Sequence, residues 1–158
     1  MKFFYFIILL LVVFSSCDSK YVFEDYKTLS HEGWNRDSVI IFNMPVKNID
    51  HSYKMYVNIR NLGNYSKRNL WLYISIKYPD GNLYSDTLEF YLADEMGIWE
   101  GKGIGDLYDN QFFYKKNIFF PVIGDYSVSL QHMMKEKNLK GITDVGIQLE
   151  SENIDVSN

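Results

Sequence analysis

Two segments of the chain alternate apolar and polar residues with the two-residue period of a β-strand. Every second side chain is apolar in residues 53–60, and leucine or isoleucine fills every second position in residues 70–77. Such alternation places the apolar side chains on one face of a strand, so each segment is predicted to bury that face. The Pro-Asp-Gly-Asn sequence at residues 79–82 is a strong turn signal, and an extended pattern resumes over residues 84–92. Residues 69–92 are therefore predicted to form a β-hairpin.

Extended patterns elsewhere raise the expected number of strands to about eight. They cover residues 39–42, 107–114, 117–120, 126–133 and 142–149, with residues 21–26 as a further candidate. Aromatic residues, which favour strands, are abundant, with 13 Tyr, 11 Phe and 3 Trp. The one helical candidate, residues 133–137, is shorter than a helix that is stable alone. Strands at near-regular spacing predict an all-β fold, an antiparallel β-sandwich, with a closed barrel as the alternative.

The first 17 residues have the form of a bacterial lipoprotein signal. Lys2 is followed by 12 apolar residues at positions 3–14, and two serines precede Cys17. A membrane-spanning helix needs about 20 apolar residues, whereas a basic start, a short apolar run and small residues indicate a cleaved signal. Phe14 stands where such signals prefer leucine. We expect cleavage before Cys17 and a lipid on its sulfur; the alternative is an ordinary secretory signal with a chance cysteine.

This interpretation divides the chain into four parts. Residues 1–16 are the signal peptide, 17–30 the lipidated N-terminus and tether, 31–150 the sandwich domain and 151–158 a frayed tail. Removal of the signal leaves enough chain for one domain with a real hydrophobic core. A single acyl chain holds a protein only marginally, but several hold it firmly, so a triacylated Cys17 would anchor the protein without a transmembrane helix.

Charge and cysteine content exclude several functions. The chain has 16 basic and 20 acidic residues, and the signal removes one basic residue, Lys2, so the net charge changes from −4 to −5. Nucleic acid and anionic lipid both require a basic surface, for which there is no case here. Because Cys17 is the only cysteine, no disulfide can form within the domain, and stability must come from burial.

A glycine-rich stretch at residues 97–105, Gly-Ile-Trp-Glu-Gly-Lys-Gly-Ile-Gly, invites comparison with a phosphate-binding loop. Three residues rather than four separate Gly97 from Gly101, and Gly103 stands where that loop needs a hydroxyl residue. No parallel strand–helix unit surrounds the stretch. We therefore expect no nucleotide, and a bulged loop whose glycines take positive φ.

Acidic residues cluster around the same stretch: Asp94, Glu95, Glu100, Asp106 and Asp109. A calcium site is one alternative, but the Asp-x-Asp-x-Asp-Gly pattern is absent, and solvated turn carboxylates are favoured. A glycosidase carboxylate pair is weaker still. Hairpin turns need about two to five residues, so residues 92–111 form an unusually long connection, predicted to be a partner-contacting loop. Its candidate binding residues are Asp94, Trp99, Asp106, Tyr108 and Asp109; the alternative is that Trp99 belongs to the core.

No catalytic or metal constellation is visible. The three histidines lie far apart with no metal-ligand spacing: His31, His51 and His132. The Gly-x-Ser-x-Gly nucleophile motif is absent. We expect neither an enzyme nor a cofactor or metal. Three tryptophans could form a sugar-stacking platform, although packing in the core is favoured: Trp34, Trp71 and Trp99.

Several short motifs connect the chain to a known family. The longest is Leu-Ala-Asp-Glu-Met-Gly-Ile-Trp-Glu-Gly-Lys-Gly-Ile-Gly-Asp-Leu-Tyr-Asp-Asn-Gln at residues 92–111, and Gly-Ile-Thr-Asp-Val-Gly at residues 141–146 is also specific. Weaker matches are Phe-Glu-Asp-Tyr-Lys at 23–27, Tyr-Val-Asn-Ile-Arg-Asn at 56–61 and Asn-Leu-Trp-Leu at 69–72. With these motifs, the chain resembles the gliding motility lipoprotein GldH family of Bacteroidota over essentially the whole mature sequence.

The resemblance implies a lipid-anchored, non-enzymatic accessory protein of gliding motility and the associated type IX secretion and envelope machinery. Its implied partners are the membrane, through the lipid on Cys17, and other gliding or secretion proteins of the envelope. Only Cys17 transfers as a functional residue. The single acidic residue after it, Asp18, favours the periplasmic face of the outer membrane. The alternative function is a glycan-binding or glycan-processing outer-membrane lipoprotein.

Overall fold

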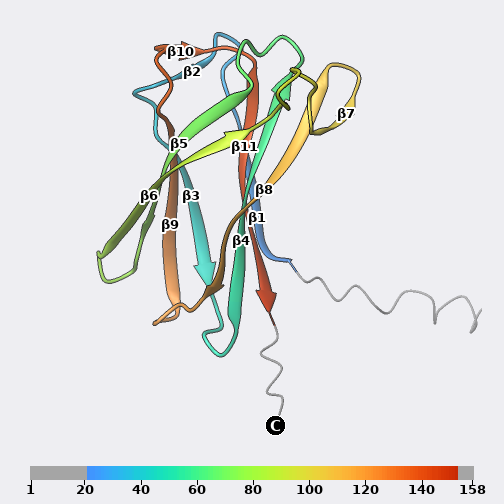
Figure 1. The fold of residues 1–158 in the computed structure, drawn as a ribbon. Coiled ribbons are helices and arrows are strands. Elements are labelled where there is room, and N and C mark those ends of the chain that lie inside the picture. The colour runs from blue at the N-terminus through green and yellow to red at the C-terminus, as the bar shows by residue number, and fades with distance from the viewer. Residues whose placement is uncertain (1–20, 153–158) are drawn as a thin grey trace, which may run out of the picture.

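Two antiparallel sheets pack face to face in the structure, a computed structural model in which residues 21–152 are described (Figure 1). The signal segment, Cys17 and residues 153–158 lie outside the described residues. The predicted all-β sandwich is confirmed, and the barrel alternative is wrong, because each sheet has two separate edges within the described part of the chain. The described chain forms 11 strands rather than about eight, because several strands are only two or three residues long.

The first sheet has five strands, and the second has four. In spatial order the first contains β1 (Tyr21–Thr28), β11 (Ile142–Glu152), β4 (Ser52–Leu62), β8 (Leu107–Ile118) and β7 (Lys102–Ile104). The second contains β3 (Ile40–Val46), β9 (Gly124–His132), β5 (Asn69–Lys77) and β6 (Leu83–Tyr91). Two short strands pair separately, β2 (Trp34–Asn35) with β10 (Asn138–Leu139).

The two alternating segments form strands, as predicted, and each strand lies in the interior of its sheet. Residues 53–60 lie in β4, and residues 70–77 lie in β5, which pairs with β6 from Asn69–Tyr91 to Lys77–Leu83. The side chain of Asp80 accepts a hydrogen bond from the backbone N–H of Asn82, at 2.9 Å, and Gly81 takes a φ of 90°. The predicted hairpin at residues 69–92 is thus confirmed, turn included.

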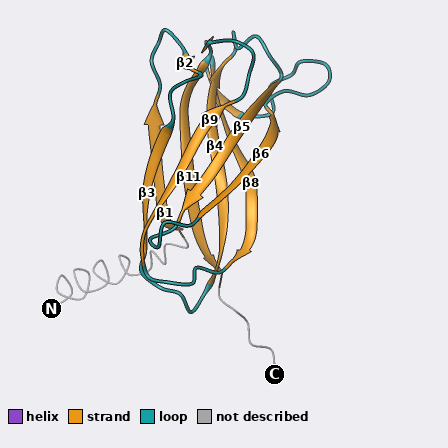
Figure 2. Cartoon of the chain, turned by 90° about the vertical axis from the view of Figure 1, so that its left-hand side faces the viewer, coloured by secondary structure: helices purple, strands orange, loops and turns teal. Residues whose placement is uncertain are grey.

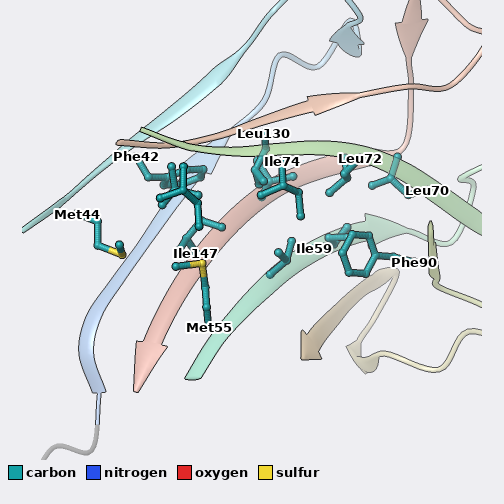
Figure 3. Packing of buried hydrophobic residues seen from close by; sticks show 14 of the residues in the cluster. Phe42, Met44, Met55, Ile59, Leu70, Leu72, Ile74, Phe90, Leu130 and Ile147 are labelled. Carbon is teal, nitrogen blue, oxygen red and sulfur yellow. The ribbon is translucent and has the colours of Figure 1, made fainter. Parts of the chain in front are cut away.

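The core lies between the two sheets and is built from inward-facing side chains of both (Figure 3). The first sheet contributes Met55, Val57, Ile59 and Ile147, and the second contributes Phe42, Leu70, Leu72, Ile74 and Leu130; all are fully buried. Burying one such side chain stabilises the fold by about 1.5–3 kcal/mol. The alternating apolar residues therefore hold the two sheets together, because they are buried between them. The described domain contains no disulfide.

Two local predictions differ from the structure. Residues 107–114 and 117–120 are not two strands, because β8 runs unbroken to Ile118. Its pairing with β4 shifts register twice near Met55, and Asn117 takes a φ of 53°, so the bulged strand shows no regular alternation. Residues 133–137 are not helical: Met134 is buried, and its sulfur lies 3.4 Å from the backbone nitrogen of Trp71.

The sandwich is also longer than the expected segment 31–150. Residues 21–28, expected within the tether, form β1, which pairs along β11. Strand β11 continues to Glu152, two residues into the expected tail. The candidate strand at residues 21–26 is confirmed within β1.

The ends of the described chain lie together at one end of the sandwich. Tyr21 pairs with Glu150, so β1 begins where β11 ends, and we call this the terminal end. Leu62 pairs with Leu107 at the other end, which also carries β7 and which we call the distal end. Figure 2 shows the strands running between these two ends.

His132 is a buried, neutral residue of the distal end. It is fully buried, and its Nε2 donates a hydrogen bond to the backbone oxygen of Trp34, at 3.0 Å. Nδ1 has no hydrogen-bond partner. Burial lowers the pKa of His132 from 6.5, and the nearby charge of Arg36 lowers it further.

Stability is therefore expected to fall as the pH drops below 6.5. The unfolded chain binds a proton at His132 that the folded chain does not, so protons favour unfolding over this range. Thermal melts above and below pH 6.5 should show the loss. His132→Gln keeps a donor toward Trp34 but cannot titrate, so its melting temperature should change less. An equal decline in both proteins would contradict this assignment. The hydrogen bond from Lys67 lowers the pKa of Glu136 from 4.5. The stability that ionised Glu136 contributes is therefore lost only as the pH falls below about 4.5.

Candidate functional site

The predicted partner-contacting segment, residues 92–111, is ordered rather than open. It contains a hydrogen-bonded turn at residues 93–99, the strand β7 and the first part of β8. Ile104 pairs with Leu107, and Gly105 takes a φ of 66° in the tight turn between them. The segment therefore presents two turns at the distal end, one after β6 and one between β7 and β8 (Figure 1).

Asp94 holds the first turn together. Its Oδ1 accepts hydrogen bonds from the backbone N–H groups of Met96, at 2.9 Å, and Ile98, at 2.8 Å. Its own N–H donates to the backbone oxygen of Ile98. Asp94 thus fixes the turn that presents its neighbours.

Trp99 and Tyr108 pack against each other below the turns. Their ring centroids are 5.8 Å apart, and Trp99 also lies 6.3 Å from the buried ring of Tyr65. Trp99 is half-buried at the margin of the core. A Cβ at Gly103 would lie 3.1 Å from the Tyr108 ring, so this glycine permits the close approach of β7. The aromatic pair therefore supports the turns.

The other two predicted site residues lie apart. The backbone oxygen of Asp106 accepts a hydrogen bond from Gly63 N–H at 3.0 Å, and its side chain is exposed at the distal end. Asp109 points to the outer face of the first sheet, where its Oδ2 accepts a hydrogen bond from Arg60 Nε at 3.2 Å. The structure brings Trp99 and Tyr108 together but does not gather all five residues into one site.

The most exposed apolar side chains of this segment were not among the predicted site residues. Met96 is 85% exposed, Ile98 62% and Ile104 91%, and we call these three residues the distal patch. Glu95, Glu100 and Asp106 are exposed in the same segment. Clusters of exposed apolar residues with polar surroundings mark interaction sites. In the sequence, each of the three is an apolar residue beside a glycine in a turn-rich segment, which is a sign of exposure. Only the structure shows that the three side chains are exposed.

A concave feature lies on the outer face of the first sheet. It is a groove of about 590 Å³ near Tyr26 and Asp109. Four amide residues line it: Asn58, Asn110, Gln111 and Gln148. Gln111 Nε2 donates to Gln148 Oε1 at 2.8 Å, and the Arg60 guanidinium lies 4.3 Å from the centre of the Tyr26 ring. Such amides can donate to and accept from hydroxyl groups.

The remaining sequence candidates do not form a site. Trp34 is buried and Trp71 lies on the outer face of the second sheet, so the three tryptophans share no platform. Across residues 21–152 no group of three or more His, Cys, Asp or Glu side chains is placed to hold a metal ion. The same residues contain no helix long and apolar enough to cross a membrane.

Comparison with known proteins decides the family. Residues 21–149 match the family model described as GldH lipoprotein. The chain belongs to the GldH lipoprotein family. This membership confirms the resemblance, and it implies a membrane-anchored protein of the cell envelope.

Two relatives match most of the chain. A gliding motility lipoprotein GldH homolog from Christiangramia forsetii is 40% identical, with 89% of this chain and 90% of the relative covered. The gliding motility lipoprotein GldH of Flavobacterium johnsoniae is 34% identical, with 91% and 93% covered.

Solved structures superpose only loosely on this chain. A family GH115 4-O-methyl-α-glucuronidase covers 87% of this chain at 12% identity and a TM-score of 0.42, and the chain spans 18% of that protein. Dimeric latent PorU from Porphyromonas gingivalis also covers 87%, at 7% identity and a TM-score of 0.35, with 14% of its own length spanned. At these TM-scores the overlap supports no functional conclusion.

Proposed function

We propose that this protein is a lipid-anchored, non-enzymatic accessory of gliding motility and the associated type IX secretion machinery. It acts by binding another envelope protein through its distal patch. The relatives named as gliding motility lipoproteins support the process, at 40% and 34% identity. The observation that supports the mode of action is the distal patch: Met96 and Ile98 lie in the turn that Asp94 fixes, and Ile104 lies at the tight turn between β7 and β8.

The position of the anchor favours a protein partner for this patch. Tyr21 begins at the terminal end, four residues after Cys17. Ile104 and Met96 lie at the opposite end of the sandwich. A lipid on Cys17 would hold the terminal end at the bilayer, so the distal patch would face away from that membrane. We place the anchor at the periplasmic face of the outer membrane.

The chemistry around the patch indicates what the partner presents. Glu95, Glu100 and Asp106 carry negative charge in the same segment, with Lys102 as the nearby positive charge. An apolar pocket bordered by basic residues would complement this surface. Apolar contact would supply affinity, and the charges would help orientation.

Changing Met96 and Ile104 together to Asp is expected to abolish or severely impair gliding. Both side chains are almost fully exposed, so the folded state loses little packing and the melting temperature should stay nearly unchanged. Spreading of colonies from a chromosomal replacement strain, and thermal melting of the purified protein, provide the two measurements.

A matched control uses the same residue types elsewhere. Met133 is 53% exposed and Ile41 54% exposed, and both lie outside the distal patch. The double variant Met133→Asp and Ile41→Asp should leave gliding intact. Normal gliding in the Met96→Asp and Ile104→Asp strain would place the partner surface elsewhere.

Glycan binding is the second candidate function, favoured by the groove on the first sheet. Its amides and the half-buried ring of Tyr26 resemble the polar and aromatic surfaces that contact sugars. Titration of the protein with neutral oligosaccharides separates the two candidates. Binding that Gln111→Ala removes, with gliding unaffected by the distal-patch variant, would favour the glycan function.

A further inference from the structure

The terminal end carries a second group of exposed apolar side chains. They lie in the loop between β3 and β4, at the start of β6 and in the loop between β8 and β9. We call them the terminal patch: Ile49, Leu83, Phe119, Val122 and Ile123. Leu83 and Ile123 are each 62% exposed and Phe119 is 60% exposed. Exposure of apolar side chains to water is unfavourable in free energy. A second surface that covered these loops would remove that unfavourable exposure.

The loop between β8 and β9 is held firmly in place. Phe120 is buried, and its ring centroid lies 4.7 Å from that of Tyr126 and 5.3 Å from that of Tyr53. The Tyr126 hydroxyl donates to the backbone oxygen of Val122 at 2.8 Å. Because Phe120 occupies the core position, Phe119 on the adjacent position is directed out of it.

The neighbouring loops are fixed to the same frame. The Tyr53 hydroxyl donates to the backbone oxygen of Asn48 at 2.6 Å, beside Ile49. The turn before Leu83 contacts the β8–β9 loop, since a Cβ at Gly124 would lie only 2.9 Å from Cγ of Pro79. The terminal patch is therefore a preformed surface.

The anchor determines what lies opposite this surface. Three residues lie between Cys17 and Tyr21, so the link is four residue steps long. At about 3.3–3.6 Å per residue, this link spans at most about 14 Å. A bilayer that holds a lipid on Cys17 is thus within that distance of the terminal end. This step rests on the lipid anchor of the proposed function.

We propose that the terminal patch inserts into the surface of the bilayer that holds the lipid anchor. The patch is a second membrane contact, and it holds the sandwich upright with the distal patch outward. Charges around it are mixed, with Lys47 and Lys116 against Asp50 and Asp125. Apolar burial therefore drives the insertion, and zwitterionic lipid suffices.

Site-specific fluorescence tests the contact in the full-length lipidated protein. Ile123→Cys is labelled with bimane, and the protein is reconstituted into phosphatidylcholine vesicles with or without doxyl-labelled lipid. The sulfur of an acylated Cys17 is blocked, so only the new thiol reacts. Ile104→Cys is the matched control, because Ile104 is 91% exposed at the distal end. Leu83→Cys tests a second loop of the patch.

The expected result is blue-shifted emission and quenching by doxyl lipid for the labels at Ile123 and Leu83, with neither change for the label at Ile104. If all three labels stay unquenched while the protein floats with the vesicles, the anchor holds and the membrane contact is wrong. If the protein does not float with vesicles, the lipid anchor itself fails, and the proposal fails with it. A label at Ile123 that is blue-shifted but not quenched indicates contact with another copy of this chain and also overturns the proposal.

Discussion

A Trp34→Ala variant is expected to lose about 3–5 kcal/mol of folding free energy, as large aromatic truncations in cores do. Trp34 is only 2% exposed, and its Nε1 donates to the backbone oxygen of Ser38 at 3.1 Å. Its ring also packs edge-on against His132, with centroids 5.2 Å apart. Domains of this size are stable by about 5–15 kcal/mol, so the variant should lose a substantial part of its stability.

Urea unfolding measures the loss as a lower midpoint with an unchanged slope. Trp71→Ala is the matched control, because Trp71 is 39% exposed on the outer face of the second sheet. Trp71→Ala should lower the free energy of unfolding by clearly less than Trp34→Ala. Equal losses in the two variants would show that the packing of Trp34 does not stabilise the distal end.

A Cys17→Ser variant is expected to abolish lipid attachment altogether. The thioether bond to the diacylglyceryl group requires the cysteine sulfur, and the chain has no other cysteine. Radiolabelled palmitate should enter the wild-type protein and not the variant. The variant should also persist as an uncleaved or mislocalised precursor, which an immunoblot of membrane and soluble fractions detects.

Ser19→Ala is the control for this change, since it alters a neighbouring residue but retains the sulfur. It should incorporate palmitate normally. Equal labelling of Cys17→Ser and the wild type would contradict the signal interpretation. Loss of labelling without loss of gliding would instead separate the anchor from the function.

The central strands could be predicted because their two faces meet different surroundings. In β5, Leu72 and Ile74 face the core while Tyr73 is only half-buried, and the sequence shows the same alternation. Strand β1 gives a weaker pattern because it is an edge strand with much of its surface exposed. The full length of strand β8 could not be predicted, because bulges and the positive φ of Asn117 interrupt its two-residue alternation.

The candidate surfaces were harder to predict because exposure is a tertiary property. Ile104 and Ile123 look alike in sequence as single isoleucines beside glycine, and neither belongs to a periodic run. Only the course of the strands places one at the distal end and the other at the terminal end. Asp94 illustrates the reverse case, since an aspartate that bonds to backbone N–H groups two and four residues later is a local turn device.

The direction of β1 has a mechanical consequence. A pulling force between a lipid on Cys17 and a partner at the distal patch would enter the domain at Tyr21 and act along the strands. Strand β1 pairs with β11 from Tyr21 to Thr28, so such a force loads its ladder of hydrogen bonds in shear. In shear the bonds resist together, whereas a force across the strands would break them one after another. With such an anchor and such a partner, the domain would transmit tension between them without unzipping at its edge.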